Sequence, residues 1–311
     1  MKILLTKEIH QSGLTLLKSQ NIDFDICEIK NLASRDMVKY SGIISMLSDN
    51  IDKDFLHLNN HLKVISNYAV GFNNIDIKTA KELNIKIGNT PDVLTDATAD
   101  IAFGLILSVT RNFKQGMNNV SEGKWKTWEP LGFLGMGLKG KTLGIIGLGR
   151  IGKEVAYRAK FGFGMNVVYY HPSKNDIDSN YQHVSLEKLF KTSDIVSLHC
   201  PLTSLTNNLV NKDNISKMKD GSYFINTARG LMHNEKDLHD ALLSGKLRGV
   251  GLDVTNPEPM ESDSKLLNHP NSIILPHIGS ATDESRESMS IICAENIING
   301  LKGLKLKCEV C

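Results

Sequence analysis

Three side chains of this sequence could do chemistry together, and each of them follows an apolar run. Arg229 lies in Asn-Thr-Ala-Arg-Gly, Glu258 lies between two prolines, and His277 follows Leu-Pro. A cation can hold the carboxylate and carbonyl of a 2-keto acid, and a histidine can donate a proton near neutral pH. Together with a hydride source, this set of residues could reduce a 2-keto acid.

Each of the three residues also has an ordinary structural interpretation. Arg229 could form a surface ion pair, Glu258 could be a solvated turn residue, and His277 could cap a helix. Their placement favours the chemical interpretation, because each follows a predicted strand of the same unit. The carboxyl ends of parallel strands face one crevice, so the three side chains can converge there.

Other histidines are weaker candidates. His199 also ends a predicted strand, but it lies in an apolar run, which favours an interior histidine or one beside the cofactor. His57 and His61 have the i, i+4 spacing of metal ligands, yet the sequence offers no third ligand near them. We expect both to be surface residues, and we expect no metal site.

A glycine-rich turn indicates where the hydride source binds. The apolar run Thr142 to Ile146 leads into Gly147-Leu-Gly149-Arg-Ile-Gly152 and then into a predicted helix. Gly147 allows the tight turn, Gly149 lets the backbone approach a pyrophosphate, and Gly152 lets the helix pack closely on the strand. Free N–H groups at the helix start would face the anion. Residues 135–140 match the same glycine pattern but follow no strand, so they predict a loop.

The surrounding elements alternate between strand and helix, which predicts an α/β protein with parallel sheets. A first unit contains five short apolar runs, and a second contains six, which fit a doubly wound sheet. A long apolar helix is predicted from about Ala97 to Asn112, an irregular stretch from Gly123 to Gly140, and a last helix from Glu284 to Gly300. The predicted runs are 3–5, 24–26, 42–47, 62–65 and 85–87 in the first unit and 142–146, 166–170, 195–199, 222–226, 249–254 and 272–276 in the second.

Length and composition exclude several classes of protein. A chain of 311 residues is long enough for two domains, and 41% hydrophobic with 23% charged residues is ordinary for a globular protein. The net charge of +2, with scattered Lys and Arg, argues against a nucleic-acid partner. The sequence has no signal-peptide core and no apolar run of membrane-spanning length, so we expect a cytoplasmic protein without a membrane partner.

The five cysteines have irregular spacing, which is typical of reduced cytosolic thiols. Cys308 and Cys311 have the C-x-x-C spacing of redox or metal sites. No helix follows them and no second pair completes a metal site, so we expect two incidental thiols on a loose tail.

Across nearly its whole length the sequence resembles the D-isomer-specific 2-hydroxyacid dehydrogenases, and within that family the glyoxylate/hydroxypyruvate reductases. The motifs that carry the resemblance are Val70-Gly71, Thr90 to Asp100, Gly144 to Gly152, His199-Cys-Pro-Leu-Thr, Ile225 to Gly230, Gly251-Leu-Asp-Val, Pro257-Glu-Pro and Pro276-His-Ile-Gly-Ser. The resemblance implies that Arg229, Glu258 and His277 form a catalytic triad.

The resemblance also implies roles for neighbouring residues. It implies that Val70 and Gly71 offer backbone N–H groups to the substrate carboxylate, and that Gly149, Arg150 and Ile151 hold the pyrophosphate. It further implies that Thr227, Asp253 and Gly279 line the nicotinamide side.

The resemblance predicts two Rossmann-like domains with a cleft between them and a C-terminal helix that returns to the N-terminal domain. We expect a substrate-binding domain at 1–96 and 284–311 and a dinucleotide-binding domain at 97–283. A homodimer is the expected state, and the aromatic stretch Trp125 to Phe133 could contribute to it, although packing on its own domain is an equal alternative. The alternatives for function are a short phosphoglycerate-dehydrogenase-like enzyme and a catalytically silent nucleotide-sensing scaffold.

The residue after the strand 166–170 bears on which cofactor is used. An NAD site usually places Asp or Glu there, where it binds the ribose hydroxyls and repels a 2′-phosphate. This sequence has His171 at that position, followed by Ser173 and Lys174. We therefore expect a preference for NADPH over NADH, with Ser173 and Lys174 at the 2′-phosphate; the alternative is that His171 tolerates either cofactor.

Overall fold

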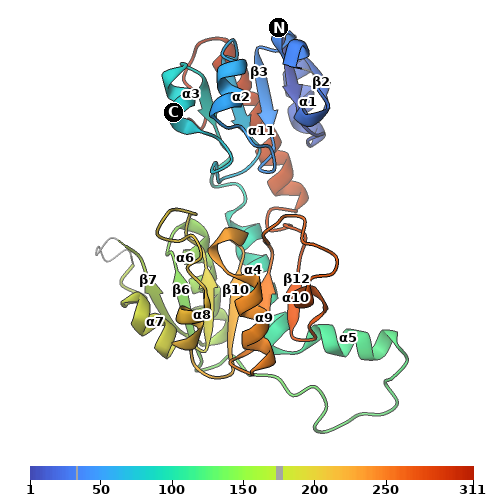
Figure 1. The fold of residues 1–311 in the computed structure, drawn as a ribbon, viewed down its shortest axis with the longest axis vertical. Coiled ribbons are helices and arrows are strands. Elements are labelled where there is room, and N and C mark those ends of the chain that lie inside the picture. The colour runs from blue at the N-terminus through green and yellow to red at the C-terminus, as the bar shows by residue number, and fades with distance from the viewer. Residues whose placement is uncertain (33, 173–177) are drawn as a thin grey trace. The chain divides into compact units, whose positions relative to one another are not determined.

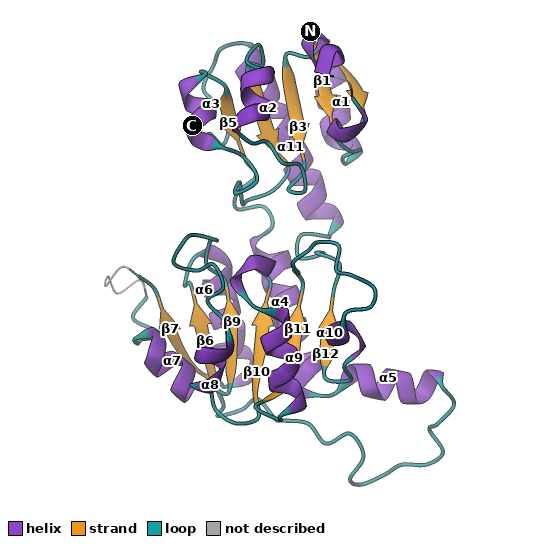
Figure 2. Ribbon diagram, in the orientation of Figure 1, coloured by secondary structure: helices purple, strands orange, loops and turns teal. Residues whose placement is uncertain are grey.

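The computed structural model describes residues 1–32, 34–172 and 178–311. The chain forms two compact units: the first combines Met1–Leu94 with Ser280–Cys311, and the second is Thr95–Gly279. Each unit contains one parallel sheet with helices on both faces (Figures 1 and 2). The predicted α/β class with two parallel-sheet domains is confirmed. None of the described helices is long and apolar enough to cross a membrane.

The first unit has a five-stranded sheet in the order β2-β1-β3-β4-β5. Its strands are β1 (Lys2–Leu5), β2 (Asp23–Ile26), β3 (Gly42–Ser45), β4 (Val64–Asn67) and β5 (Lys86–Gly88). Its helices are α1 (Gln11–Ser19), α2 (Lys53–Leu58), α3 (Ile77–Glu82) and α11 (Asp283–Leu301). Asp52 and Asp76 accept backbone N–H bonds at the starts of α2 and α3, which explains where these two helices begin.

The last helix, α11, packs on the sheet of the first unit, as the resemblance implied. Thr282 caps its start, and a Cβ on Gly300 would collide with the side chain of Val64 on β4. Glycine at this position therefore lets the helix lie close against the strand. The residues after α11 were expected to be a loose tail, and that expectation is wrong. The N–H of Val310 bonds to Ile87 O and the N–H of Ile87 bonds to Cys311 O, so the chain end pairs with β5.

The second unit has a seven-stranded parallel sheet in the order β12-β11-β10-β9-β6-β7-β8. Its strands are β6 (Thr142–Ile146), β7 (Asn166–Tyr170), β8 (Gln182–His183), β9 (Ile195–Leu198), β10 (Ser222–Asn226), β11 (Leu247–Leu252) and β12 (Ser272–Ile274). Its helices are α4 (Thr95–Thr110), α5 (Phe113–Ser121), α6 (Arg150–Tyr157), α7 (Leu186–Thr192), α8 (Lys212–Ser216), α9 (Glu235–Leu243) and α10 (Lys265–Asn268). The two-residue edge strand β8 was not among the six predicted strands.

Successive strand residues supply two separate cores in this unit. On β10, Tyr223 and Ile225 pack into the core that α4 and α6 cover, whereas Phe224 packs into the core that α7, α8 and α9 cover. This alternation follows from the period of two in a strand. Because both faces are buried, the strands read in sequence as continuous apolar runs.

The predicted long helix 97–112 is α4 in the structure, and the helix that follows it, α5, was not predicted. α4 ends at Thr110, Asn112 takes a left-handed backbone with φ of 56°, and α5 begins at Phe113. None of the residues of α5 is buried, and Figure 1 shows α5 and the loop after it extending away from the seven-stranded sheet. Residues 123–140 form a loop, as predicted.

Candidate active site

The glycine turn lies between β6 and α6, as predicted. Gly147 has φ of 98°, and a Cβ there would lie 2.7 Å from Cys200. A Cβ on Gly152 would collide with the carbonyl oxygen of Gly147, so both positions require glycine. Gly149 differs, because a Cβ there would meet nothing within 4 Å. The backbone at Gly149 therefore faces open space, as approach to a pyrophosphate requires.

The start of α6 is a suitable place for such a ligand, because the first-turn N–H groups of a helix have no acceptor within the helix. Gly149 is the N-cap and supplies no side-chain acceptor to the first turn, which contains Arg150 and Ile151. A second observation also fits a bound dinucleotide: the Thr227 hydroxyl is buried and has no hydrogen-bond partner among the described residues. Buried polar groups are rarely left unpaired, so a ligand is the expected partner. These features lie at the carboxyl ends of β6 and β10.

The structure brings His277 and Glu258 together. His277 Nδ1 lies 2.7 Å from Glu258 Oε1, and the two side chains are 22% and 36% exposed. An imidazole whose Nδ1 faces a carboxylate keeps Nε2 available for another group. His277 also has φ of 55°, a left-handed backbone that is uncommon outside glycine and that often marks functional residues.

Asp253 fixes the loop that carries His277. The backbone N–H groups of Ile278 and Gly279 bond to the two carboxylate oxygens of Asp253, at 2.8 and 2.7 Å. Asp253 is buried, and this desolvation raises the pKa of its carboxyl group, while the two backbone bonds oppose the change. Each carboxylate oxygen has further acceptor capacity, so this geometry leaves Asp253 able to bind a third donor.

Arg229 is part of the same charge cluster. It follows β10, and its backbone is extended. Desolvation lowers the pKa of the Arg229 guanidinium, and the nearby carboxylate of Glu258 raises it. The charges of His277 and Glu258 act in turn on Asp253. The three residues proposed from sequence, which follow β10, β11 and β12, thus lie within electrostatic reach of one another.

The Val70-Gly71 segment follows β4 in the other unit, and two asparagine side chains hold its carbonyl groups. Asn89 Nδ2 donates to Val70 O and Asn67 Nδ2 donates to Gly71 O, each at 2.8 Å. Across the described part of the chain, the N–H groups of Val70 and Gly71 have no partner. This arrangement leaves two backbone donors free, which is what a carboxylate ligand requires.

The other residues singled out from the sequence lie outside this charge cluster or outside the described residues. His199 is partly buried, its Nε2 lies 2.8 Å from Ser197 Oγ, and desolvation lowers its pKa to about 3. The backbone oxygen of His171 lies 3.2 Å from His183 Nε2, on the edge strand β8. Ser173 and Lys174 lie outside the described residues. His57 and His61 are exposed, as predicted.

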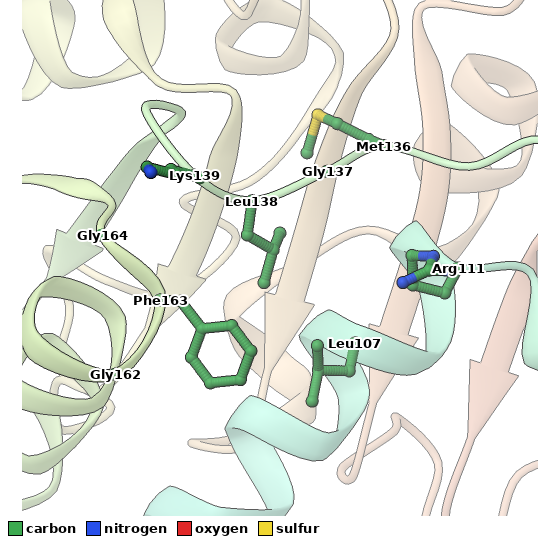
Figure 3. A pocket seen from close by; sticks show the side chains of 9 residues that line it. All are labelled: Leu107, Arg111, Met136, Gly137, Leu138, Lys139, Gly162, Phe163 and Gly164. Carbon is green, nitrogen blue, oxygen red and sulfur yellow. The ribbon is translucent and has the colours of Figure 1, made fainter.

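One cavity in the second unit lies away from these residues. It has a volume of about 450 Å³ and is shown in Figure 3, where Leu107, Leu138 and Phe163 converge. Its other lining residues are Arg111, Met136, Gly137, Lys139, Gly162 and Gly164. Two of its lining segments, 136–139 and 162–164, lie just before β6 and β7, so the cavity is at the amino ends of these strands. The glycine turn is at the carboxyl end of β6, so this cavity does not hold the dinucleotide.

Comparisons with known proteins agree with this geometry. Residues 103–279 match the family model for the NAD-binding domain of D-isomer specific 2-hydroxyacid dehydrogenases. The glyoxylate reductase of Thermococcus litoralis is 39% identical over 97% of this chain and 94% of that protein. A protein of Thermus thermophilus superposes with a TM-score of 0.93 at 38% identity, over 100% of both chains.

An NADPH-dependent glyoxylate/hydroxypyruvate reductase of Sinorhizobium meliloti, in complex with NADP and malonate, has a TM-score of 0.88. It is 29% identical and covers 99% of this chain and 97% of that one. The family model spans more than half of the chain, and the Thermococcus relative is similar over nearly all of it. The chain therefore belongs to the D-isomer-specific 2-hydroxyacid dehydrogenase family of oxidoreductases.

Proposed function

We propose that this protein reduces a small 2-keto acid, such as glyoxylate or hydroxypyruvate, to the D-2-hydroxy acid with a reduced nicotinamide cofactor. The observation that carries the proposal is the His277–Glu258 pair at 2.7 Å, with Arg229 in the same cluster. A positioned acid and a cation beside it are what reduction of a keto acid needs. The glyoxylate reductase names of the relatives support the choice of substrate.

Proton transfer is assigned to His277. Its Nδ1 faces Glu258, so Nε2 is the nitrogen that donates a proton to the keto oxygen of the substrate. The Glu258 carboxylate contacts Nδ1 and fixes the ring orientation. After the proton leaves, His277 is neutral and takes up another proton from solvent.

Substrate binding is assigned to Arg229, Val70 and Gly71. The guanidinium presents paired planar donors, which suit a carboxylate together with the adjacent carbonyl oxygen. The N–H groups of Val70 and Gly71, which have no partner among the described residues, provide further donors for the carboxylate. The two regions come from different units of the chain, which we propose act as substrate-binding and dinucleotide-binding domains.

The nicotinamide cofactor supplies the hydride that adds to the carbonyl carbon. In this proposal, Gly147, Gly149 and Gly152 with the first turn of α6, which includes Arg150 and Ile151, hold the pyrophosphate. Thr227, Asp253 and Gly279 lie on the nicotinamide side. Two observations support this assignment: the Thr227 hydroxyl has no partner in the described part of the chain, and Asp253 has spare acceptor capacity.

We further propose that NADPH is preferred over NADH. His171 replaces the carboxylate that would repel a 2′-phosphate, and its position directly after β7 supports this interpretation. Ser173 and Lys174 are proposed to contact the phosphate. A Lys174→Ala variant should then raise the KM for NADPH and leave the KM for NADH unchanged. An unchanged NADPH KM, or a clear preference of the wild type for NADH, would contradict the preference.

One panel of assays tests the substrate. Glyoxylate, hydroxypyruvate, pyruvate and 2-ketogluconate are each mixed with the enzyme and NADPH or NADH, and nicotinamide absorbance is followed. We expect the highest kcat/KM with glyoxylate or hydroxypyruvate. Absence of turnover with every keto acid would contradict the enzymatic function and favour a silent nucleotide-binding scaffold.

We also propose that the protein is a homodimer formed through α5 and the loop after it. Phe113, Met117 and Val120 are exposed and lie at helical spacing on one face of α5. Five more large apolar residues are exposed in the loop, namely Trp125, Trp128, Leu131, Phe133 and Leu134. An apolar surface of this extent is typical of a protein interface. The apolar cavity of Figure 3 lies beside the end of this loop, at Met136 to Lys139, and we assign a second copy of the chain as the partner.

A further inference from the structure

A buried asparagine organises the loop that carries Arg229. Asn226 is the last residue of β10 and is fully buried. Its Oδ1 accepts a bond from the N–H of Ala228 at 2.8 Å, and its Nδ2 donates to the carbonyl oxygen of Arg229 at 2.8 Å. One side chain therefore binds the backbone on both sides of the turn and sets the position of the Arg229 backbone.

His233 contacts the nitrogen of the same amide. His233 Nδ1 lies 2.9 Å from Asn226 Nδ2, and the ring is buried with its edge toward Phe224. The N–H of Ala228 requires the amide oxygen on its own side, so the amide nitrogen must face the histidine. That nitrogen is a donor, so Nδ1 has to be an acceptor and the ring proton lies on Nε2.

The consequence is a neutral histidine in a single tautomer. A protonated ring would place two donors against each other at the 2.9 Å contact. Burial also lowers the pKa of His233 to about 4, which keeps the ring neutral under ordinary conditions. His233 Nε2 is buried and has no partner among the described residues. The histidine thus keeps one hydrogen bond to Asn226 while its other nitrogen is unsatisfied.

The segment that leads to Glu258 also packs against this turn. A Cβ on Gly230 would overlap the backbone of Thr255, so the two segments are in close contact. The N–H of His233 bonds to Gly230 O at 3.2 Å. Arg229 therefore lies between a residue held by Thr255 and an asparagine held by His233.

We propose that His233 is a positioning residue, which acts through Asn226 to hold Arg229 in the orientation that binds the substrate carboxylate. The inference rests on the proposed role of Arg229 in the keto acid reductase. In this role His233 does not touch the substrate. It fixes the rotation of the Asn226 amide, and the amide fixes the turn.

A purely structural role makes the opposite prediction for one substitution. His233→Leu keeps a similar side-chain volume and removes the buried Nε2–H that has no partner among the described residues. If His233 only filled space, this variant would therefore keep wild-type kinetics. It also removes the acceptor for Asn226 Nδ2. His233→Asn provides an oxygen at the δ position and should accept the same bond. Met232→Leu is the matched control, because Met232 is buried in the same turn and its side chain makes no bond to Asn226.

Steady-state kinetics with the preferred keto acid and cofactor give the first test. In His233→Leu the position of Arg229 is no longer fixed, so the keto acid KM should rise about tenfold. The cofactor KM should stay within about twofold of wild type. His233→Asn should recover most of the loss, and Met232→Leu should match wild type. A His233→Leu enzyme with a wild-type keto acid KM would overturn the proposal. Equal rises in both KM values would also overturn it.

A double-mutant comparison asks whether the effect passes through Arg229. In an Arg229→Lys background, His233→Leu should cause no further rise in the keto acid KM, because the group it positions is already lost. Additive effects would mean that His233 acts by another route, which overturns the proposal.

Nitrogen-15 NMR of histidine-labelled wild-type protein tests the contact without any substrate. At about pH 7 the His233 signals, assigned by their absence from His233→Leu, should show a protonated Nε2 and an unprotonated Nδ1. A cationic ring or the reverse tautomer would overturn the proposal. If the wild type reduces no keto acid, the proposed function fails, and these NMR signals alone then decide whether the His233–Asn226 contact exists.

Discussion

His277 Nδ1 lies 2.7 Å from Glu258 Oε1 on segments that follow two different strands, β12 and β11. Glu258→Gln keeps the size of the side chain and removes its charge. Because a neutral amide binds the ring N–H less strongly than a carboxylate does, kcat for keto acid reduction should be lower across the pH range. The measurement is kcat for both enzymes across a range from about pH 5 to about pH 9. Superimposable profiles would show that the carboxylate charge does not support proton donation.

Arg229→Lys tests whether the guanidinium binds both the carboxylate and the carbonyl oxygen of the substrate. Lysine keeps the positive charge but presents a single ammonium, so it cannot bind a carboxylate and a carbonyl oxygen in one plane. We expect a higher KM and a kcat/KM lower by about tenfold to a hundredfold for the keto acid, with little change in cofactor KM. Arg248→Lys is a control, since Arg248 bonds to Leu134 O in the loop after α5. Wild-type kinetics for Arg229→Lys would place Arg229 outside the site.

The exposed apolar face of α5 predicts the oligomeric state. Light scattering should give about twice the 34.4 kDa mass of one chain at micromolar concentration. Met117→Asp with Val120→Asp places two charges on that face and should shift the mass toward a monomer. Leu58→Asp, at a residue that is also exposed but lies on α2 in the other unit, should remain a dimer. A wild-type mass near that of one chain, or an unchanged mass for the double variant, would contradict this interface.

His233 should make the fold sensitive to mild acid. An ordinary histidine has a pKa of 6.5, and burial lowers that of His233 to about 4 in the folded protein. Between these values the unfolded chain binds a proton that the folded chain does not, so the free energy of unfolding falls as pH decreases from 6.5 toward 4. The contribution is on the order of 3 kcal/mol. Urea unfolding at about pH 7 and about pH 4.5 measures the loss.

The same measurement on His233→Leu separates this residue from the rest of the chain. The variant should lose less unfolding free energy between the two pH values than the wild type does. Met232→Leu should lose as much as the wild type. Equal losses in the wild type and His233→Leu would mean that His233 is protonated in the folded state, contrary to its burial and its bond to Asn226.

Much of the fold could be predicted because both sheets are parallel and buried on both faces. Strands such as β6 and β10 appear in sequence as continuous apolar runs, and the residues after their carboxyl ends had to share one edge. This reasoning placed Arg229, Glu258 and His277 in one cluster from the sequence alone. The glycine turn was predictable for a similar reason, since Gly147 and Gly152 meet neighbours that leave no room for a Cβ.

The features that could not be predicted from the sequence form few contacts or contact distant parts of the chain. α5 has an apolar stripe of Phe113, Met117 and Val120, but none of its residues is buried, so the core of this unit gives no reason to expect a helix there. β8 has two residues at a sheet edge, too few to show a period. The chain end looked loose because its partner, β5, lies far earlier in the chain. The Asn226–His233 contact joins two polar residues with no spacing rule between them, so only the structure shows it.

His277→Ala tests whether His277 donates the proton in the nicotinamide-dependent reduction. Cofactor binding is measured by fluorescence titration and turnover by nicotinamide absorbance, in the same preparation. We predict that kcat for the best keto acid falls by about a hundredfold or more, while the dissociation constant of the reduced cofactor stays unchanged. A His277→Ala enzyme that keeps wild-type kcat would show that His277 is not the proton donor.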